Sequence, residues 1–182
     1  MSEQERIELT RDVDVIMIPD GTASSLAQDH TVTVHQSLGN SFTVITEYGH
    51  MVQIAGADAD ALGKEPIEID TLVCGSDIHS VEKNCWEVMK TVYDPEIPVN
   101  IVELGLVYHC KVSPIAEGQY SVNVIMTLTA PGCGMGPMIQ SEVEIGLKKL
   151  HGVQSVNVEV VFSPPWSREM MSEVAQLQLG MI

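Results

Sequence analysis

One stretch constrains the fold of this chain most: a strand pattern that runs through a turn rich in glycine and proline directly into a helix pattern. From Tyr120 to Leu128, apolar and polar residues largely alternate, which is the period of a strand with one buried face. From Met138 to Leu150, apolar residues recur at helical spacing behind Pro137, which suits a first helical position. The turn therefore joins a strand to a helix.

Cys133 lies in this turn, just before the predicted N-terminus of the helix. Backbone N–H groups there lack intrahelical partners, and the helix dipole favours negative charge. We therefore expect Cys133 to be a thiolate, the form that attacks electrophiles and binds soft metals such as iron. The alternative is a small buried residue that fills a tight turn. We favour the functional interpretation, because loops shaped by proline and glycine commonly carry binding residues.

The charge balance narrows the range of partners. The 182 residues include 25 acidic and 9 basic side chains, for a formal net charge of -16. Such a chain lacks the basic surface that nucleic acids or anionic membranes require. No apolar run approaches the roughly 20 residues of a membrane span, and the start does not resemble a signal peptide. We therefore expect a cytoplasmic protein that binds neither nucleic acid nor membrane.

The four cysteines are widely spaced and form no C-x-x-C pair, which argues against a zinc site or a redox dithiol. In a reducing cytoplasm we expect free thiols. Cys85 falls on the apolar face of a predicted helix and Cys110 on that of a predicted strand, so packing is the expected role of both. Cys74 falls in a predicted linker, and its role is left open.

The N-terminal part, residues 1–63, predicts a β-rich domain. Strand-forming runs separated by turn residues occupy 13–17, 31–35, 42–47 and 51–54. Four or five short strands at this spacing are typical of a small barrel or sandwich. One helical turn is expected at 57–63, ended by Gly63.

Residues 64–77 lack a sustained period and predict a linker, so a second domain is expected at 78–182. Its pattern predicts a helix capped by Ser80, strands over 104–112 and 120–128, the helix after Cys133, a strand over 156–162 and a short helix capped by Ser167. This α-β-β-α-β-α order predicts an α+β fold with helices packed on a small sheet. A right-handed crossover would make the last two strands parallel and place the Cys133 turn at their carboxyl edge, where ligand sites collect.

Two enzyme-like interpretations of the turn fit poorly. A dinucleotide fingerprint that starts at Gly132 would need glycine where Pro137 stands, and the Lys-Ser/Thr pair of a phosphate loop is missing. A cysteine hydrolase would pair Cys133 with a histidine. However, His151 is expected at the far end of the same helix and His109 several residues from the turn. We therefore expect a protein that is not an enzyme.

Three ordered motifs resemble those of the MIP18-like family of iron-sulfur assembly proteins. They are Tyr93 to Tyr108 (YDPEIPVNIVELGLVY), Met126 to Cys133 (MTLTAPGC) and Ser163 to Trp166 (SPPW). The resemblance covers about residues 81–174, and the β-rich extension resembles the SufT branch of the family. Many members have proline directly after the motif cysteine, where this chain has Gly134.

The resemblance implies an accessory role in iron-sulfur protein maturation and a compact α/β domain. It implies that Cys133 is the reactive residue and metal ligand, and that Asp94, Glu96 and Thr129 line the same region. The implied cargo is transient iron or an iron-sulfur cluster. The implied partners are the assembly machinery and client apoproteins. Without the resemblance, Asp94 and Glu96 are equally well explained as residues that end the preceding helix and lie in a solvated loop.

One thiolate cannot fill the four positions usual for a cluster. Our hypothesis is therefore a dimeric carrier in which each subunit supplies one Cys133, with other ligands from a client or a small thiol. The alternative is a non-catalytic interaction module whose acidic surface and Met170-Met171 end recruit clients without binding a cluster. In that case Cys133 only shapes the turn. A thiol enzyme is a weaker third possibility.

Overall fold

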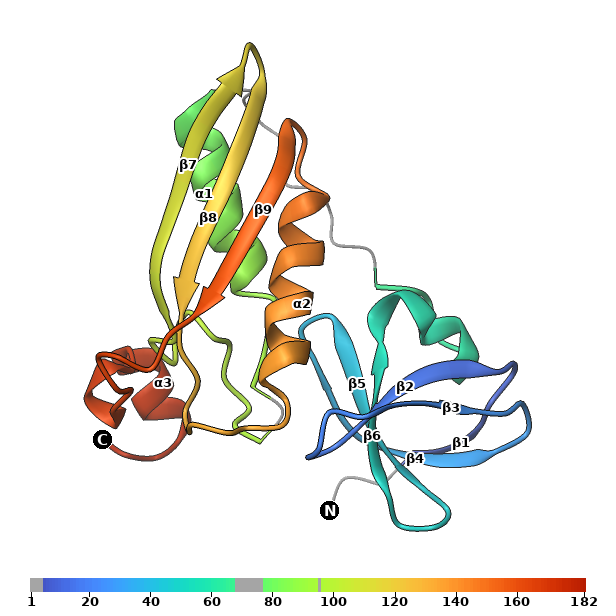
Figure 1. Cartoon of the computed structure of the whole chain (residues 1–182). Helices are drawn as coiled ribbons and strands as arrows, with labels where there is room; N and C mark the ends of the chain where they lie inside the picture. The colour runs from blue at the N-terminus through green and yellow to red at the C-terminus, as the bar shows by residue number, and fades with distance from the viewer. Residues whose placement is uncertain (1–4, 68–76, 95) are drawn as a thin grey trace. The chain divides into compact units, whose positions relative to one another are not determined.

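The computed structural model of the chain describes residues 5–67, 77–94 and 96–182. The backbone divides into two compact units, Met1–Ile69 and Asp70–Ile182 (Figure 1). Most of the predicted linker at 64–77, including Cys74, lies outside the described residues. The predicted domain boundaries therefore stay a prediction.

The first unit is built on a six-stranded sheet in which every neighbouring pair is antiparallel. Its strands are β1 (Arg6–Glu8), β2 (Val13–Met17), β3 (Ala23–Leu26), β4 (Thr31–Leu38), β5 (Ser41–Thr46) and β6 (Met51–Ala55). The order across the sheet is β1-β4-β5-β6-β2-β3. Sequence patterns did not predict β1 and β3, because both are short edge strands without an apolar alternation. Whether the sheet forms a barrel or a sandwich stays a prediction.

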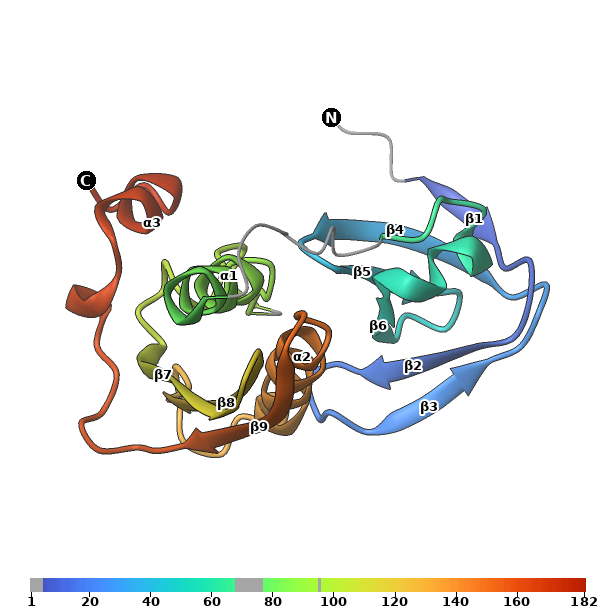
Figure 2. The ribbon, with the colours of Figure 1, turned by 90° about the horizontal axis from the view of Figure 1, so that it is seen from above.

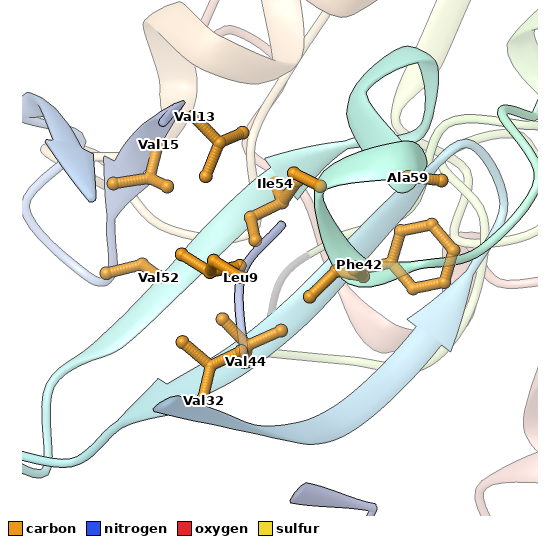
Figure 3. Packing of buried hydrophobic residues seen from close by; sticks show 11 residues of the cluster. Leu9, Val13, Val15, Val32, Phe42, Val44, Val52, Ile54 and Ala59 are labelled. Carbon is orange, nitrogen blue, oxygen red and sulfur yellow. The ribbon is translucent and has the colours of Figure 1, made fainter. Parts of the chain in front are cut away.

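Aliphatic side chains from most of these strands converge on one core, together with Leu9, Phe42 and Ala59 (Figure 3). The short helix η1 (Gly56–Leu62) contributes Ala59, Ala61 and Leu62 to it. It ends at Gly63, whose φ of 66° is left-handed. The predicted helical turn ended by glycine is therefore confirmed.

The second unit is a three-stranded sheet, β7-β8-β9, with helices packed on it. Its elements are α1 (Ile78–Met89), β7 (Val107–Ala116), β8 (Gln119–Met126), α2 (Gly136–Lys148), β9 (Val153–Val160), η2 (Arg168–Met170) and α3 (Glu173–Gln178). Strands β7 and β8 form an antiparallel hairpin, and β8 pairs with β9 in parallel. Helices α1 and α2 lie on one face of the sheet (Figure 2). The mixed α+β class and the parallel pair are confirmed.

Neither serine predicted as a helix cap makes a capping hydrogen bond, although Ser167 stands at the N-cap position of η2. Asp77, not Ser80, caps α1: its carboxylate accepts hydrogen bonds from the backbone amides of His79 and Ser80. The hydroxyl of Ser80 also donates to this carboxylate, which lowers the pKa of Asp77. Near the C-terminus, Ser172 caps α3, whereas the side chain of Ser167 makes no capping bond. Ser80 lies three positions after Asp77 and Ser167 five positions before Ser172, and a polar residue near a helix start gives the same sequence signal as the cap itself.

The predicted strand at 104–112 begins later, at Val107. The preceding residues turn instead, because the side chain of Asn100 accepts hydrogen bonds from the amides of Val102 and Glu103. Asparagine favours such side-chain-to-backbone turns.

No described helix is both long and apolar enough to cross a bilayer.

Candidate functional site

The loop between β8 and α2 holds Cys133 in two consecutive turns. The amide of Cys133 donates to the carbonyl of Ala130 over 3.4 Å, and the carbonyl of Cys133 accepts from the amide of Gly136 over 3.1 Å. Gly132 has a φ of 78°, a left-handed conformation that suits glycine, and a side chain there would meet no atom within 4 Å. The loop shape therefore depends on the backbone conformation of Gly132.

Cys133 is half-buried, and it is the only cysteine in the described ranges that solvent reaches appreciably. Cys85 on α1 and Cys110 on β7 are 0% and 5% exposed. These two thiols interact with each other: the hydrogen bond to Cys110, together with burial, raises the pKa of Cys85. Their predicted role in packing is consistent with this burial.

The start of α2 differs from the expectation of several unpaired amides. The amides of Met138 and Ile139 both donate to the carbonyl of Met135, and Pro137 has no N–H. Together with the Gly136 bond to Cys133, these contacts use the donors of the first turn. The helix dipole still acts on the loop, but a thiolate at Cys133 stays a prediction.

Asp94 is buried, 4% exposed, in the loop after α1. One of its carboxylate oxygens accepts hydrogen bonds from the amides of Glu96 and Ile97, over 2.9 and 3.0 Å. Burial raises the pKa of Asp94, although these two amide bonds oppose the shift. Glu96 is exposed. Asp94 therefore shapes the loop, and Glu96 offers a carboxylate to solvent.

Thr129 is half-buried beside the cysteine turn, and Thr127 is fully buried. The amide of Thr127 donates to the carbonyl of Leu106 over 2.8 Å, while its hydroxyl has no partner within the described residues. Sequence reasoning did not single out Thr127, since a threonine in an apolar strand looks like a packing residue. Its unpaired buried hydroxyl makes it a further residue of interest in the loop.

The loop after α1 and the loop after β8 both lie at the end of the sheet toward which β8 points (Figure 1). Among the residues the structure describes, no hydrogen bond or ion pair joins Cys133 to Asp94, Glu96 or Thr129. That these four residues line one site stays a prediction.

The three sequence motifs are joined near the carboxyl end of β8. The amide of Thr127 in the second motif bonds to Leu106 in the first, as described above. The indole of Trp166 in the third motif donates to the carbonyl of Leu104, over 2.8 Å and 62 positions of sequence. The amide of Val161, just before the third motif, donates to the carbonyl of Met126 over 2.8 Å. Residues far apart in the chain therefore support the cysteine loop together.

The C-terminal segment adds contacts that sequence patterns missed. The amide of Ser172 donates to the carbonyl of Glu103 over 2.9 Å, and its hydroxyl donates to the carboxylate of Glu103. A Cβ on Gly105 would lie 2.2 Å from the carbonyl oxygen of Met170. These pairs are separated by more than sixty positions, so no local pattern reveals them.

No group of three or more histidine, cysteine, aspartate or glutamate side chains suited to a metal ion occurs within residues 5–67, 77–94 and 96–182. A metal bound by Cys133 would therefore draw further ligands from outside this set. A soft thiolate is a suitable donor for iron.

A family profile described as iron-sulfur cluster assembly protein matches residues 82–160. A relative from Porphyromonas gingivalis, an Fe-S protein maturation auxiliary factor, is 43% identical over 101 residues, which cover 56% of this chain and 92% of the relative. The Fe-S protein maturation auxiliary factor SufT of Staphylococcus aureus is 46% identical over 89 residues, or 49% of this chain and 97% of that protein.

Among solved structures, a domain of unknown function, DUF59, from Bacillus anthracis is similar with a TM-score of 0.52 and 35% identity. The match covers 57% of this chain and 95% of that domain.

Proposed function

Since this chain belongs to the iron-sulfur cluster assembly protein family, as a SufT-like accessory factor, we propose that it carries iron or an iron-sulfur cluster transiently on Cys133. The observation that carries the proposal is the position of Cys133: it is the half-exposed cysteine of the described chain, in a glycine-shaped loop before α2. A thiolate in that position can reach both a cluster and a receiving protein.

The carrier needs ligands beyond its own loop. Iron-sulfur clusters are usually held by four thiolates, and the Cys133 loop supplies one. In a homodimer, Cys133 of each subunit would supply one ligand, and a client apoprotein or a small thiol would supply the rest. Incomplete ligation suits a carrier, because the cluster can leave when the client offers more thiolates.

We assign supporting roles to three neighbours. Asp94 would hold the acidic loop in shape through its bonds to the amides of Glu96 and Ile97. Glu96, which is exposed, would meet incoming iron or a client, and Thr129 would line the loop beside the thiol. The partners would be the iron-sulfur assembly machinery and client apoproteins in the cytoplasm. The protein itself would catalyse no reaction.

Anaerobic reconstitution with iron and sulfide tests the carrier. We expect the native chain and the Cys74→Ala variant to develop the charge-transfer absorption of sulfide-bound iron and to retain it through desalting. Cys133→Ala should lose that absorption. The proposal fails if Cys133→Ala retains as much iron and sulfide as the native chain.

The alternative function is an adaptor that recruits clients without binding a cluster. The apolar side chains exposed near the C-terminus, including Met170, Val174 and Leu177, favour it. The alkylation rate separates the two functions: a carrier requires Cys133 to react with iodoacetamide near neutral pH much faster than Cys74. Equal rates, measured by mass spectrometry of the two peptides, would favour the adaptor.

A further inference from the structure

Met170, the last residue of η2, is held against the first motif by its backbone. A Cβ on Gly105 would lie 2.2 Å from the carbonyl oxygen of Met170, so the two backbones are in direct contact. The amide of Met170 donates to the carbonyl of Ser167 over 3.0 Å, which closes the turn of η2. These contacts fix where the Met170 side chain starts.

The hydroxyl of Tyr108 lies between the Met170 side chain and the third motif. It donates to the carbonyl oxygen of Pro164 over 2.7 Å, and it lies 3.8 Å from the Met170 sulfur, within hydrogen-bond reach of that atom. A phenol has one O–H, so the two acceptors share one donor. A carbonyl oxygen is a strong acceptor and a thioether sulfur is a weak one. The bond to Pro164 therefore prevails.

The chemistry of the Met170 sulfur can reverse this ranking. Met170 is 37% exposed, so a small oxidant reaches it. Hydrogen peroxide oxidises a thioether by two electrons: one peroxide oxygen bonds to the sulfur, the O–O bond breaks, and the other oxygen leaves with both hydrogens as water. The sulfoxide oxygen is a much stronger acceptor than the thioether. On Met170 it would stand within reach of the Tyr108 hydroxyl and compete with the Pro164 carbonyl.

The bond to Pro164 belongs to the contacts that hold the third motif on the first. The indole of Trp166, two residues after Pro164, donates to the carbonyl of Leu104 over 2.8 Å. Tyr108 and Leu104 both belong to the first motif. Without the bond to Pro164, the C-terminal segment would be held at fewer points and would open more often.

We propose that Met170 is a site of reversible oxidation, and that its sulfoxide takes the Tyr108 hydroxyl from Pro164 and loosens residues 163–172 from the first motif. The inference goes beyond the carriage of a cluster and does not depend on it, since no step involves Cys133 or iron. The reverse step uses a dithiol as the two-electron reductant. It restores the thioether, releases the oxygen as water and leaves a disulfide on the reductant.

Hydrogen exchange of the full chain, measured by mass spectrometry without added iron, tests the proposal. The chain is treated with hydrogen peroxide, and dithiothreitol then reduces disulfides and sulfenic acids but leaves sulfoxides. Peptide masses show which methionines carry an added oxygen. Once Met170 is oxidised, we expect the hydrogen-bonded amides of Met170, Met171 and Ser172 to exchange about fivefold faster. Methionine sulfoxide reductases should restore the original rate.

Three variants identify the sulfur and the hydroxyl that act. Met170→Leu should keep its original exchange rate after peroxide, because leucine has no sulfur to oxidise. Met181→Leu is the matched control: Met181 is 42% exposed on the same C-terminal segment, and its replacement should leave the peroxide effect unchanged. Tyr108→Phe lacks the shared donor, so its exchange should be fast before treatment and no faster after it.

Three results would each overturn the proposal. One is unchanged exchange at residues 170–172 in a chain whose peptide masses show Met170 sulfoxide. Another is an equal acceleration in Met170→Leu, because oxidation elsewhere would then be the cause. The third is a Met170 that gains no oxygen under conditions that oxidise Met181. Iron retention by Cys133 is measured separately, so failure of this proposal and failure of the carrier are distinguishable.

Discussion

Gly105 shows how one residue links two distant parts of the second unit. Its φ is 73°, and a Cβ would lie 2.2 Å from the backbone carbonyl oxygen of Met170. The segment around Met170 therefore packs directly on the backbone of the first motif. Only glycine permits both this conformation and this approach.

Gly105→Ala should destabilise the second unit by about 2 to 5 kcal/mol, because left-handed strain adds to a clash with backbone. Gly118→Ala is the matched control. Its φ is 68°, but a Cβ there would meet nothing within 4 Å, so the expected cost is about 1 to 2 kcal/mol. Urea unfolding measures both, and equal losses would mean that the Met170 contact is unimportant.

Glu142 on α2 should give the second unit a pH-dependent stability. Burial raises the pKa of Glu142 to about 7, above the ordinary glutamate value of 4.5. Between these values the folded chain keeps a proton that the unfolded chain has lost, so the free energy of unfolding should fall as pH rises. The loss is complete above the folded-state pKa of about 7.

Glu142→Gln should therefore stabilise the chain at pH near 8 by about 2 kcal/mol, and have little effect at pH near 4. Glu144→Gln on the same helix is the control, because that carboxylate is partly exposed and lies 2.7 Å from the Lys148 ammonium. It should give no gain at either pH. Thermal unfolding followed by circular dichroism measures these changes in stability. A gain from Glu142→Gln that is independent of pH would refute the raised pKa of Glu142.

At the scale of elements, α3 depends on its cap more than on its own length. A helix of six residues is too short to be stable alone. The Ser172 hydroxyl caps it and also donates to the carboxylate of Glu103. One side chain thus starts the helix and attaches it to the first motif.

Ser172→Ala should destabilise the unit by about 1 to 2 kcal/mol and speed amide hydrogen exchange in α3. Ser167→Ala, whose side chain makes no capping bond at the start of η2, should change neither quantity measurably. Hydrogen exchange by mass spectrometry on the C-terminal peptide measures the effect. Similar exchange in the two variants would show that α3 does not need this cap.

At the scale of the whole molecule, each of the two units has its own core. The first is packed around residues such as Val44 and Ile54, and the second around residues such as Leu104 and Ile139. Separate cores imply that each unit can fold by itself. The relatives from Porphyromonas gingivalis and Staphylococcus aureus match only 56% and 49% of this chain, which agrees with an independent unit.

A fragment of residues 77–182 should therefore fold alone, with cooperative thermal unfolding within a few degrees of the corresponding transition in the full chain. Differential scanning calorimetry of the fragment and the full chain measures this. A fragment that unfolds without a transition would mean that the first unit is required for stability.

Much of the fold followed from local patterns. Strands such as β8 and helices such as α2 are long and periodic, so alternation and helical spacing located them to within a few residues. The helix end at Gly63 and the turn before α2 were likewise predicted, because glycine and proline determine the backbone conformation at and next to their own positions. Short edge strands such as β3, and the exact caps, escaped because neighbouring polar residues carry the same signal.

For the candidate site, the sequence alone determined that Cys133 stands in a glycine-shaped turn between a strand and a helix, since that depends only on adjacent residues. It also pointed to three motifs of one family. Tertiary structure alone decided that the cysteine of α1 and that of β7 are buried against each other, and that Trp166 and Ser172 hold the first motif. Those contacts join residues that are far apart in the sequence and meet only when the chain folds. Hydrogen bonds between distant segments produce no periodic sequence pattern, so the sequence alone does not predict them.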